Sequence, residues 1–241
     1  MFPLFRAILA GGTLRDRLVA SAGGVAGIGI TAAASYLLLK GAAPLPMIVA
    51  PMGASAVLIF AVPASPLAQP WPVIGGNIIS ALVGVTVARL VPDVALAAGV
   101  AVGAAILVMS LLRCLHPPGG AAALTAVVVG AEIASAGYMF ALVPVGINAL
   151  LLALAGLLFH RFSGHSYPHR ADALPKQAER VPEPHPEDLD RALVDLGETF
   201  DISREDLALL VARVSHHAQA RSAGATGSAR SDRAVAASNR T

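Results

Sequence analysis

Between two apolar segments the chain reads Arg113-Cys114-Leu115-His116-Pro117-Pro118-Gly119-Gly120-Ala121-Ala122-Ala123-Leu124. The two prolines cannot donate backbone hydrogen bonds, and they disfavour the helical conformation in the residue before them, so a helix is predicted to end near Leu115. A second helix can begin directly afterwards, because proline is tolerated in a first helical turn. The small residues that follow would leave the first N–H groups of that helix uncovered.

Two side chains beside this helix start indicate a binding site. Arg113 and His116 would be kept inside a bilayer only with a partner, a water-filled cavity or a function. The amino-terminal end of a helix is its positive end and attracts anions. The run therefore predicts an anion site that includes Arg113, His116, Gly119 and Gly120.

The composition is typical of a membrane protein. Hydrophobic residues make up 56% of the chain and charged residues only 13%, far from the mixture of a soluble domain. Of the 15 acidic residues, only Asp16, Asp93 and Glu132 precede Arg161. A formal charge of +2 does not indicate nucleic-acid binding, and the single Cys114 excludes an intrachain disulfide.

We therefore expect an all-α membrane protein, a compact bundle of apolar helical segments followed by a short cytoplasmic helical tail. The first segment is long enough, at about 20 residues, to cross the hydrocarbon region. The second and fifth are short and begin with proline and small residues. Six such segments are predicted, at 18–39, 46–62, 73–91, 94–112, 118–131 and 138–160.

The segments indicate two internal repeats, which we place at 15–91 and 92–161. The run that begins Pro51-Met52-Gly53-Ala54-Ser55 aligns with the run that begins at Pro118, and Asn77 aligns with Asn148. Paired short segments interrupted by glycine and proline are typical of transporters whose site lies between the halves. Gly53, Ala54 and Ser55 join the candidate site on this basis. Asn77 and Asn148 are either structural hydrogen-bonding residues or ligand contacts.

Two topologies fit the pattern. Six full spans would make the halves inverted, whereas short segments that dip in and return would leave four spans and parallel halves; we favour six. Arginines near both ends of the apolar region place both termini in the cytoplasm of a multi-pass cell-membrane protein. Gly23-xxx-Gly27 and Gly99-xxx-Gly103 fit close helix packing and leave a homodimer open.

Three of these motifs together resemble the HPP family of integral membrane proteins over roughly residues 15–160. They are the run beginning His116-Pro117-Pro118, the run 51–58, and the proline-rich turn 65–70. The resemblance implies a compact multi-span bundle, with some plant members assigned to nitrite transport in plastids. Where the family often has histidine after two glycines, this chain has Gly75-Gly76-Asn77, so no proton-linked role is expected at position 77.

The remaining chain divides by composition. Residues 1–14 form a cytoplasmic segment before the transmembrane domain 15–162, residues 163–186 a linker, residues 187–220 an amphipathic helical segment, and residues 221–241 a disordered tail. Within the amphipathic segment, residues 188–193 and 201–207 resemble the sequence that joins HPP regions to paired CBS domains, but too little chain remains for that pair. The histidines of the linker have no cysteine or paired carboxylate at ligand spacing, so no metal or other cofactor is expected.

The leading functional hypothesis is a transporter or channel for a small inorganic anion, with nitrite as the candidate that the family resemblance supplies. The alternative is a membrane-anchored regulatory or scaffold protein that acts through its cytoplasmic tail. An enzyme is not expected, since the chain has no Ser/His/Asp set, HExxH motif or Walker loop.

Overall fold

The computed structural model describes residues 14–40, 46–129, 131–170, 187, 189–191 and 202–217. The chain divides into two units, Met1–Arg170 and Ala171–Thr241. The interpretations of residues 1–13, most of the linker and the last segment from 218 onward lie outside the described residues.

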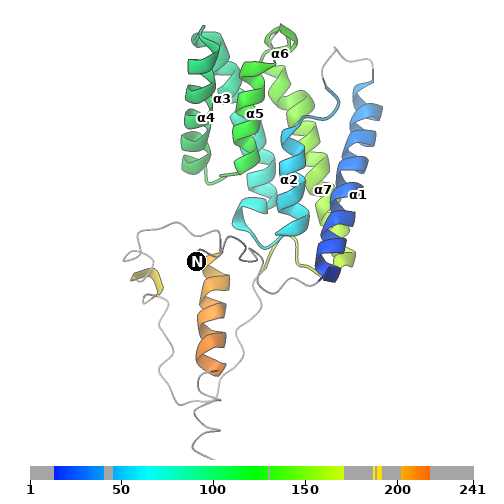
Figure 1. Cartoon of the computed structure of the whole chain (residues 1–241), viewed down its shortest axis with the longest axis vertical. Coiled ribbons are helices and arrows are strands. Elements are labelled where there is room, and N and C mark those ends of the chain that lie inside the picture. The colour runs from blue at the N-terminus through cyan, green and yellow to red at the C-terminus, as the bar shows by residue number, and fades with distance from the viewer. Residues whose placement is uncertain are drawn as a thin grey trace, which may run out of the picture. The chain divides into compact units, whose positions relative to one another are not determined.

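The first unit is a bundle of helices (Figure 1). Its α-helices are α1 (Leu14–Leu39), α2 (Pro51–Ala61), α3 (Asn77–Leu90), α4 (Val94–Leu111), α5 (Pro117–Val128), α6 (Ala131–Ala136) and α7 (Ile147–Ser163). Three shorter turns are η1 (Pro66–Ala68), η2 (Pro72–Gly76) and η3 (Ala141–Gly146). The predicted all-α membrane bundle, with two short segments among its apolar helices, is confirmed.

Among the described residues, four helical stretches are long and apolar enough to cross a membrane: Leu14–Leu39, Pro72–Leu90, Val94–Leu111 and Ala141–Ser163. The helices α2 and α5 have 11 and 12 residues, or about 16–18 Å at 1.5 Å per residue. They are too short for a hydrocarbon core of about 30 Å. Pro51 and Pro117 stand at their first positions, which explains why each helix begins inside the bundle and not at its end.

The helices α1, α3 and α5 run in one direction, and α2, α4 and α7 run in the opposite direction (Figure 1). The helix α4 therefore ends on the side where α1 begins. The helices α1 and α4 are therefore antiparallel, as are α2 and α5, and α3 and α7. The packing follows the same correspondence, because α1 packs on α7 as α4 packs on α3, and α2 packs on α7 as α5 packs on α3. Each short helix thus lies against a long helix that follows a π-helical turn.

The two small-residue glycine pairs lie in different surroundings. A Cβ atom at Gly23 would lie 2.6 Å from Phe60, and one at Gly27 would also collide with the Phe60 ring. The first small-residue pair is therefore used for packing within the chain. Nothing lies within 4 Å of a Cβ placed at Gly99 or Gly103, so the second pair faces outward.

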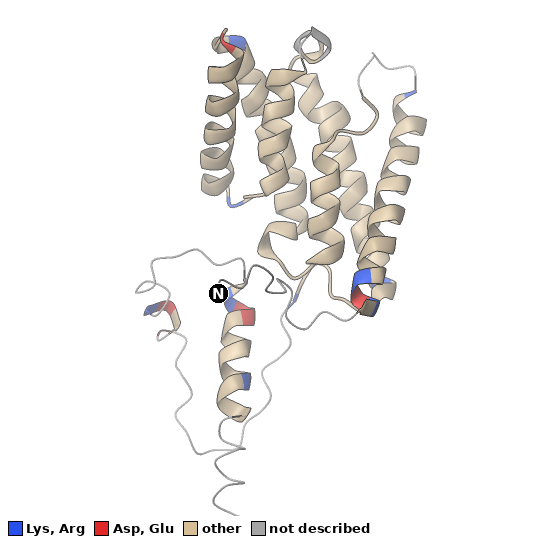
Figure 2. Ribbon diagram, viewed as in Figure 1, with Lys and Arg blue, Asp and Glu red and all other residues tan. Residues whose placement is uncertain are grey.

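Charged residues in the first unit lie at the ends of its helices, and the middle of the bundle is free of them in the part that is described (Figure 2). Asp93 caps α4 by accepting a hydrogen bond from the Leu96 N–H at 2.8 Å. The Arg89 guanidinium lies 4.6 Å from the centre of the Tyr138 ring. This distribution suits a bundle whose middle meets hydrocarbon.

The second unit contains a helix over 204–217. Ser203 accepts a hydrogen bond from the Asp206 N–H at 3.0 Å and donates to the Asp206 carboxylate at 2.6 Å, which is the geometry of a capped helix start. The Arg204 guanidinium holds the Asp190 carboxylate by two hydrogen bonds of 2.8 and 2.7 Å. Leu210 and Val214 of this helix are exposed.

Candidate functional site

The candidate site is the polar centre of the bundle, where the non-helical segment before α5 meets α2, η1 and α3. We call its members the His116 cluster: Ser55 of α2, the Leu67 carbonyl of η1, Asn77 and Ser80 of α3, and His116. The four side chains are each 0% exposed. Sequence positions 55, 77 and 116, all singled out as candidates, are brought together here.

Hydrogen bonds of the His116 ring have a fixed direction. Nδ1 of His116 lies 2.8 Å from the Leu67 carbonyl oxygen, which can only accept, so Nδ1 carries a proton. In the neutral ring Nε2 is then an acceptor. The Ser55 hydroxyl lies 2.8 Å from Nε2 and must donate to it.

The amide of Asn77 extends this chain of hydrogen bonds. Its Nδ2 group donates to the Ser55 hydroxyl oxygen at 3.3 Å and to the Val73 carbonyl oxygen at 2.8 Å. Because the Val73 carbonyl can only accept, the orientation of the amide is determined. The order of donation is therefore Asn77 to Ser55, Ser55 to His116, and His116 to Leu67.

Two atoms of the cluster have no hydrogen-bond partner in the part of the chain that the structure describes. They are Oδ1 of Asn77 and Oγ of Ser80. A buried polar atom without a partner costs about 1–3 kcal/mol, and such atoms in a native structure call for an explanation such as a ligand or water. Ser80 was not predicted, because one serine in an apolar helix gives no local signal of its role.

Glycines let the backbones approach closely around the cluster. A Cβ at Gly76 would lie 2.6 Å from the Cβ of His116 and 2.7 Å from the Cys114 carbonyl oxygen. A Cβ at Gly119 would lie 2.7 Å from Oγ of Ser80. Gly119 therefore leaves the Ser80 hydroxyl facing the first turn of α5.

The structure differs from the expectation of free helix-start amides. Pro51, Pro117 and Pro118 have no N–H group. The N–H groups of Met52 and Gly53 donate to the carbonyls of Val49 and Ala50, and that of Gly119 donates to the carbonyl of His116. Both helices begin with tight turns that use these donors internally, so the side chains of the cluster carry its polar chemistry.

Four other candidate residues lie outside the enclosed cluster. Gly53 and Ala54 are exposed on the outer side of α2, and Arg113 is exposed at a left-handed backbone position with φ of 53°. Gly120 is partly buried, with Val102 the nearest neighbour of its absent Cβ. The cluster thus has no arginine among its enclosed side chains.

Asn148 belongs to a second buried cluster. Its Oδ1 accepts from the Val49 N–H at 2.9 Å, and its Nδ2 donates to the Ser35 hydroxyl at 2.8 Å and to the Met47 carbonyl at 3.0 Å. Asn148 therefore supplies partners to the non-helical backbone before α2. This geometry favours the structural alternative for Asn148, whereas Asn77 keeps an unpartnered oxygen.

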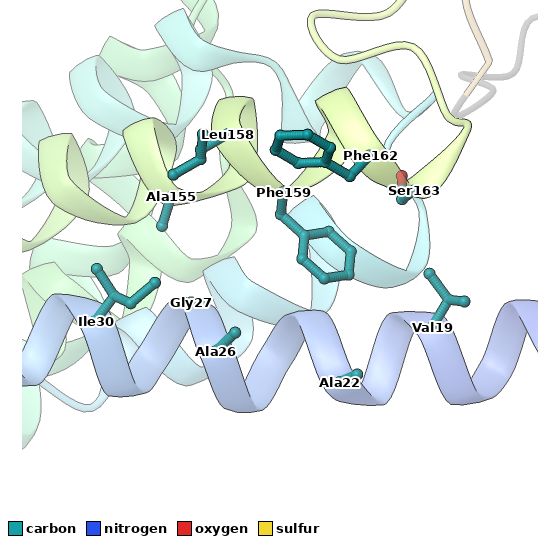
Figure 3. A pocket seen from close by; sticks show the side chains of 10 residues that line it. All are labelled: Val19, Ala22, Ala26, Gly27, Ile30, Ala155, Leu158, Phe159, Phe162 and Ser163. Carbon is teal, nitrogen blue, oxygen red and sulfur yellow. The ribbon is translucent and has the colours of Figure 1, made fainter.

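A groove of about 510 Å³ lies elsewhere, between α1 and α7. Figure 3 shows its lining, in which Ile30, Leu158, Phe159 and Phe162 supply the larger side chains. Ser163 is the only polar side chain of the lining. Because it offers almost no hydrogen-bond donors, this groove does not suit an anion.

Histidines near the end of α7 form structural contacts. Nε2 of His160 donates to the Ile59 carbonyl at 2.9 Å, and Nδ1 lies 2.8 Å from the Ser163 hydroxyl. No group of three potential metal-binding side chains occurs among the described residues. That the chain binds no metal stays a prediction, because residues 171–186 of the linker lie outside the described residues.

Comparison with known proteins agrees with this architecture. A family model described as HPP, transmembrane region, matches residues 10–168. Two transmembrane proteins of Dictyostelium discoideum are similar: one is 39% identical over 131 residues, covering 52% of this chain and 46% of the relative. The other is 40% identical over 114 residues, covering 46% and 36%. The chain thus spans less than half the length of these curated relatives. No solved structure matches.

Proposed function

We propose, from the premise that this chain belongs to the HPP transmembrane region family, that it is a transporter or channel for a small inorganic anion. Nitrite is the leading candidate, because the family includes plant members assigned to nitrite transport. The proposed binding residues are Ser55, Asn77, Ser80 and His116, and Gly119 packs closely against the Ser80 hydroxyl.

One observation carries the proposal. Oδ1 of Asn77 and Oγ of Ser80 are fully buried without partners among the described residues. Asn77 is linked to His116 through the Ser55 hydroxyl, and the Ser80 hydroxyl lies at Gly119 in the first turn of α5. Apolar residues at these positions would be at least as stable. The Thr31 hydroxyl is a third such atom, but it belongs to α1, whereas these two atoms belong to one polar cluster. A ligand that reaches this point explains why they are present.

The cluster is enclosed, so access requires movement. Ser55 belongs to α2 and His116 precedes α5, and the bond between them joins the two halves of the chain. Separation of α2 from α5 would break that bond and expose the cluster to one side of the bilayer. Such alternating exposure of a central site is typical of transporters built from internal repeats.

The test is anion flux into liposomes that contain the purified full chain. Nitrite, formate, nitrate and chloride are compared for the wild type, His116→Ala and a surface variant, Ser110→Ala. Ser110 lies in α4, where its hydroxyl donates to the Ile106 carbonyl. We expect nitrite flux for the wild type and Ser110→Ala and its loss in His116→Ala. Flux equal to that of protein-free liposomes in all three would overturn the proposal.

A second function, a membrane-anchored scaffold, is favoured by one observation. The 204–217 helix leaves Leu210 and Val214 exposed, with relative exposures of 52% and 60%, and an amphipathic helix buries such a face against a partner. A chain that ends at residue 170 separates the functions. A transporter keeps its flux after this truncation, and a scaffold loses its partner.

The remaining expectations form part of the same proposal. The protein is a multi-pass protein of the cell membrane with both termini in the cytoplasm, it binds no cofactor, and it does not act as an enzyme. Its partners are the anion and the lipid bilayer. Gly99 and Gly103 face outward on α4, so a homodimer through that face remains compatible with the fold.

A further inference from the structure

We infer that the His116 cluster takes up one proton with each anion, so that transport is electroneutral and selects the anions of weak acids. This inference rests on the proposed function and adds the form in which the substrate is bound. Nitrite and formate are anions of weak acids, whereas nitrate and chloride are anions of strong acids and are not expected to be carried.

The first argument is the charge of the enclosure. A buried anion without a compensating charge is strongly disfavoured. Arg113, the nearest arginine in the sequence, is exposed. The described residues of α2, η1, η2, α3 and α5 contain no carboxylate, and their one cation is Arg89 in the last turn of α3. A proton that enters with the anion is the remaining source of neutrality.

The second argument is the direction of the hydrogen bonds. With His116 neutral, the Ser55 hydroxyl donates its hydrogen bond to Nε2. Asn77 donates its two amide hydrogen bonds to the Ser55 hydroxyl and the Val73 carbonyl. Oδ1 of Asn77 is then an acceptor without a donor. An unprotonated anion would place its own oxygens against this acceptor. An undissociated acid would instead donate its O–H to Oδ1 and accept from the Ser80 hydroxyl.

Protonation of His116 gives the equivalent charged form. Nε2 then carries a proton and donates to Ser55, which frees the Ser55 hydroxyl proton to donate elsewhere. An anion in this form would accept from the two free hydroxyl donors, Ser55 and Ser80, and would be neutralised by the imidazolium ring, so its oxygens would be drawn to these donors and not to Oδ1 of Asn77. This form contains the same atoms and the same net charge as the neutral acid beside neutral histidine. Either form moves one proton with one anion.

Other titratable groups around the ring are few. Around the ring lie Ser55, Asn77, Ser80 and the backbone carbonyl of Leu67, and α4 adds Met109 near Gly76 and Gly119; none of these groups titrates near neutral pH. The charged residues of α3 and α4, Arg89 and Asp93, lie at the far ends of those helices. Cys114 is buried two residues before His116, and its carbonyl, like the His116 Cβ, is close to Gly76. His116 is therefore the one side chain of the cluster that can take up a proton without losing its hydrogen bond to the Leu67 carbonyl.

The test measures nitrite and formate uptake into liposomes that contain the full chain, with the membrane potential clamped by potassium and valinomycin. Passive entry of the undissociated acid is subtracted with protein-free liposomes at each pH. We expect uptake to rise by about tenfold for each unit by which the external pH falls, because one proton accompanies each anion. Reversal of the potential should change the rate by less than about twofold, because no net charge moves.

Two variants sharpen the test. Ser80→Ala removes an unpartnered buried hydroxyl from the cluster, and Thr31→Val removes another, in α1, which is also fully buried without a partner. Both changes should be tolerated by the fold, since no protein hydrogen bond is lost. We expect Ser80→Ala to reduce uptake at least about tenfold, as loss of one hydrogen bond to a charged or strongly polar group does, and Thr31→Val to leave it unchanged.

The outcomes separate the inference from the proposed function. Nitrite uptake that follows the potential and ignores pH would overturn proton coupling and leave the anion transporter standing. Equal uptake of nitrate and formate would overturn the selectivity for weak acids in the same way. Absence of any protein-dependent uptake would overturn the proposed function and this inference together. Equal losses in Ser80→Ala and Thr31→Val would remove Ser80 from the site.

Discussion

The Ser55 hydroxyl and Nε2 of His116 lie 2.8 Å apart, although 61 residues separate them in the chain. Ser55 lies in the second turn of α2, and His116 directly precedes α5. Their bond joins the two short helices, each of which begins at a proline inside the bundle. A change at either residue therefore tests both the packing of the halves and the chemistry of the site.

Replacement of Ser55 by alanine is expected to destabilise the fold. The change leaves Nε2 of His116 buried without a donor, at a cost of about 1–3 kcal/mol. Unfolding in mixed detergent micelles, followed by circular dichroism, measures this difference. Ser110→Ala is the matched control, since Ser110 is exposed and its loss should change stability by less than about 0.5 kcal/mol. Equal stability of the two variants would contradict the hydrogen-bond assignment.

Alanine at Gly76 is expected to disrupt the contact between the end of η2 and the segment before α5. Its Cβ would lie 2.6 Å from the Cβ of His116 and 2.7 Å from the Cys114 carbonyl, and overpacking of this kind costs about 1–3 kcal/mol. Gly99→Ala should instead stabilise α4 by about 0.5–1 kcal/mol, because nothing lies near that position and alanine favours helix. Thermal unfolding of the two variants in detergent should therefore move in opposite directions.

Asn148→Ala is expected to weaken the fold without a direct effect on binding. The variant loses bonds to the Val49 N–H, the Ser35 hydroxyl and the Met47 carbonyl, each worth about 0.6–1.7 kcal/mol between membrane helices. Flux per folded molecule should stay near that of the wild type, whereas Asn77→Ala should lose flux. Loss of flux in a stable, correctly folded Asn148→Ala protein would show that Asn148 is a binding residue.

Tyr167 gives the first unit a dependence on alkaline pH. Its hydroxyl donates to the Ala68 carbonyl at 2.9 Å, and burial raises the pKa of the phenol above its ordinary value. A pKa raised by folding means that this stabilisation is complete below the pKa of the unfolded chain, about 10, and is lost as the pH rises above it. Unfolding measured from pH 7 to 11 should show a loss of stability above about pH 10 that is smaller in Tyr167→Phe. An unchanged alkaline loss would contradict the assignment.

Patterns between neighbours in the sequence were enough to predict the membrane bundle, the two short segments and the start of a helix at Pro117. Helix length, apolar composition and the effect of proline on the backbone depend on residues that are close in the chain, so they can be evaluated before any tertiary contact is known. The alignment of Asn77 with Asn148 could be predicted for the same reason, because each asparagine comes shortly after a glycine in an apolar segment.

Only the tertiary structure decided what these residues contact. The same asparagine pattern gives Asn148 a full set of backbone and hydroxyl partners and leaves Oδ1 of Asn77 unpaired. Two similar glycine pairs differ too, since Gly27 packs on Phe60 and Gly103 faces outward. The face that a helix turns inward depends on its rotation and on the helices beside it, and these come from distant parts of the chain. For that reason the contact between α3 and α5, and not the local sequence, places Ser80 in the site.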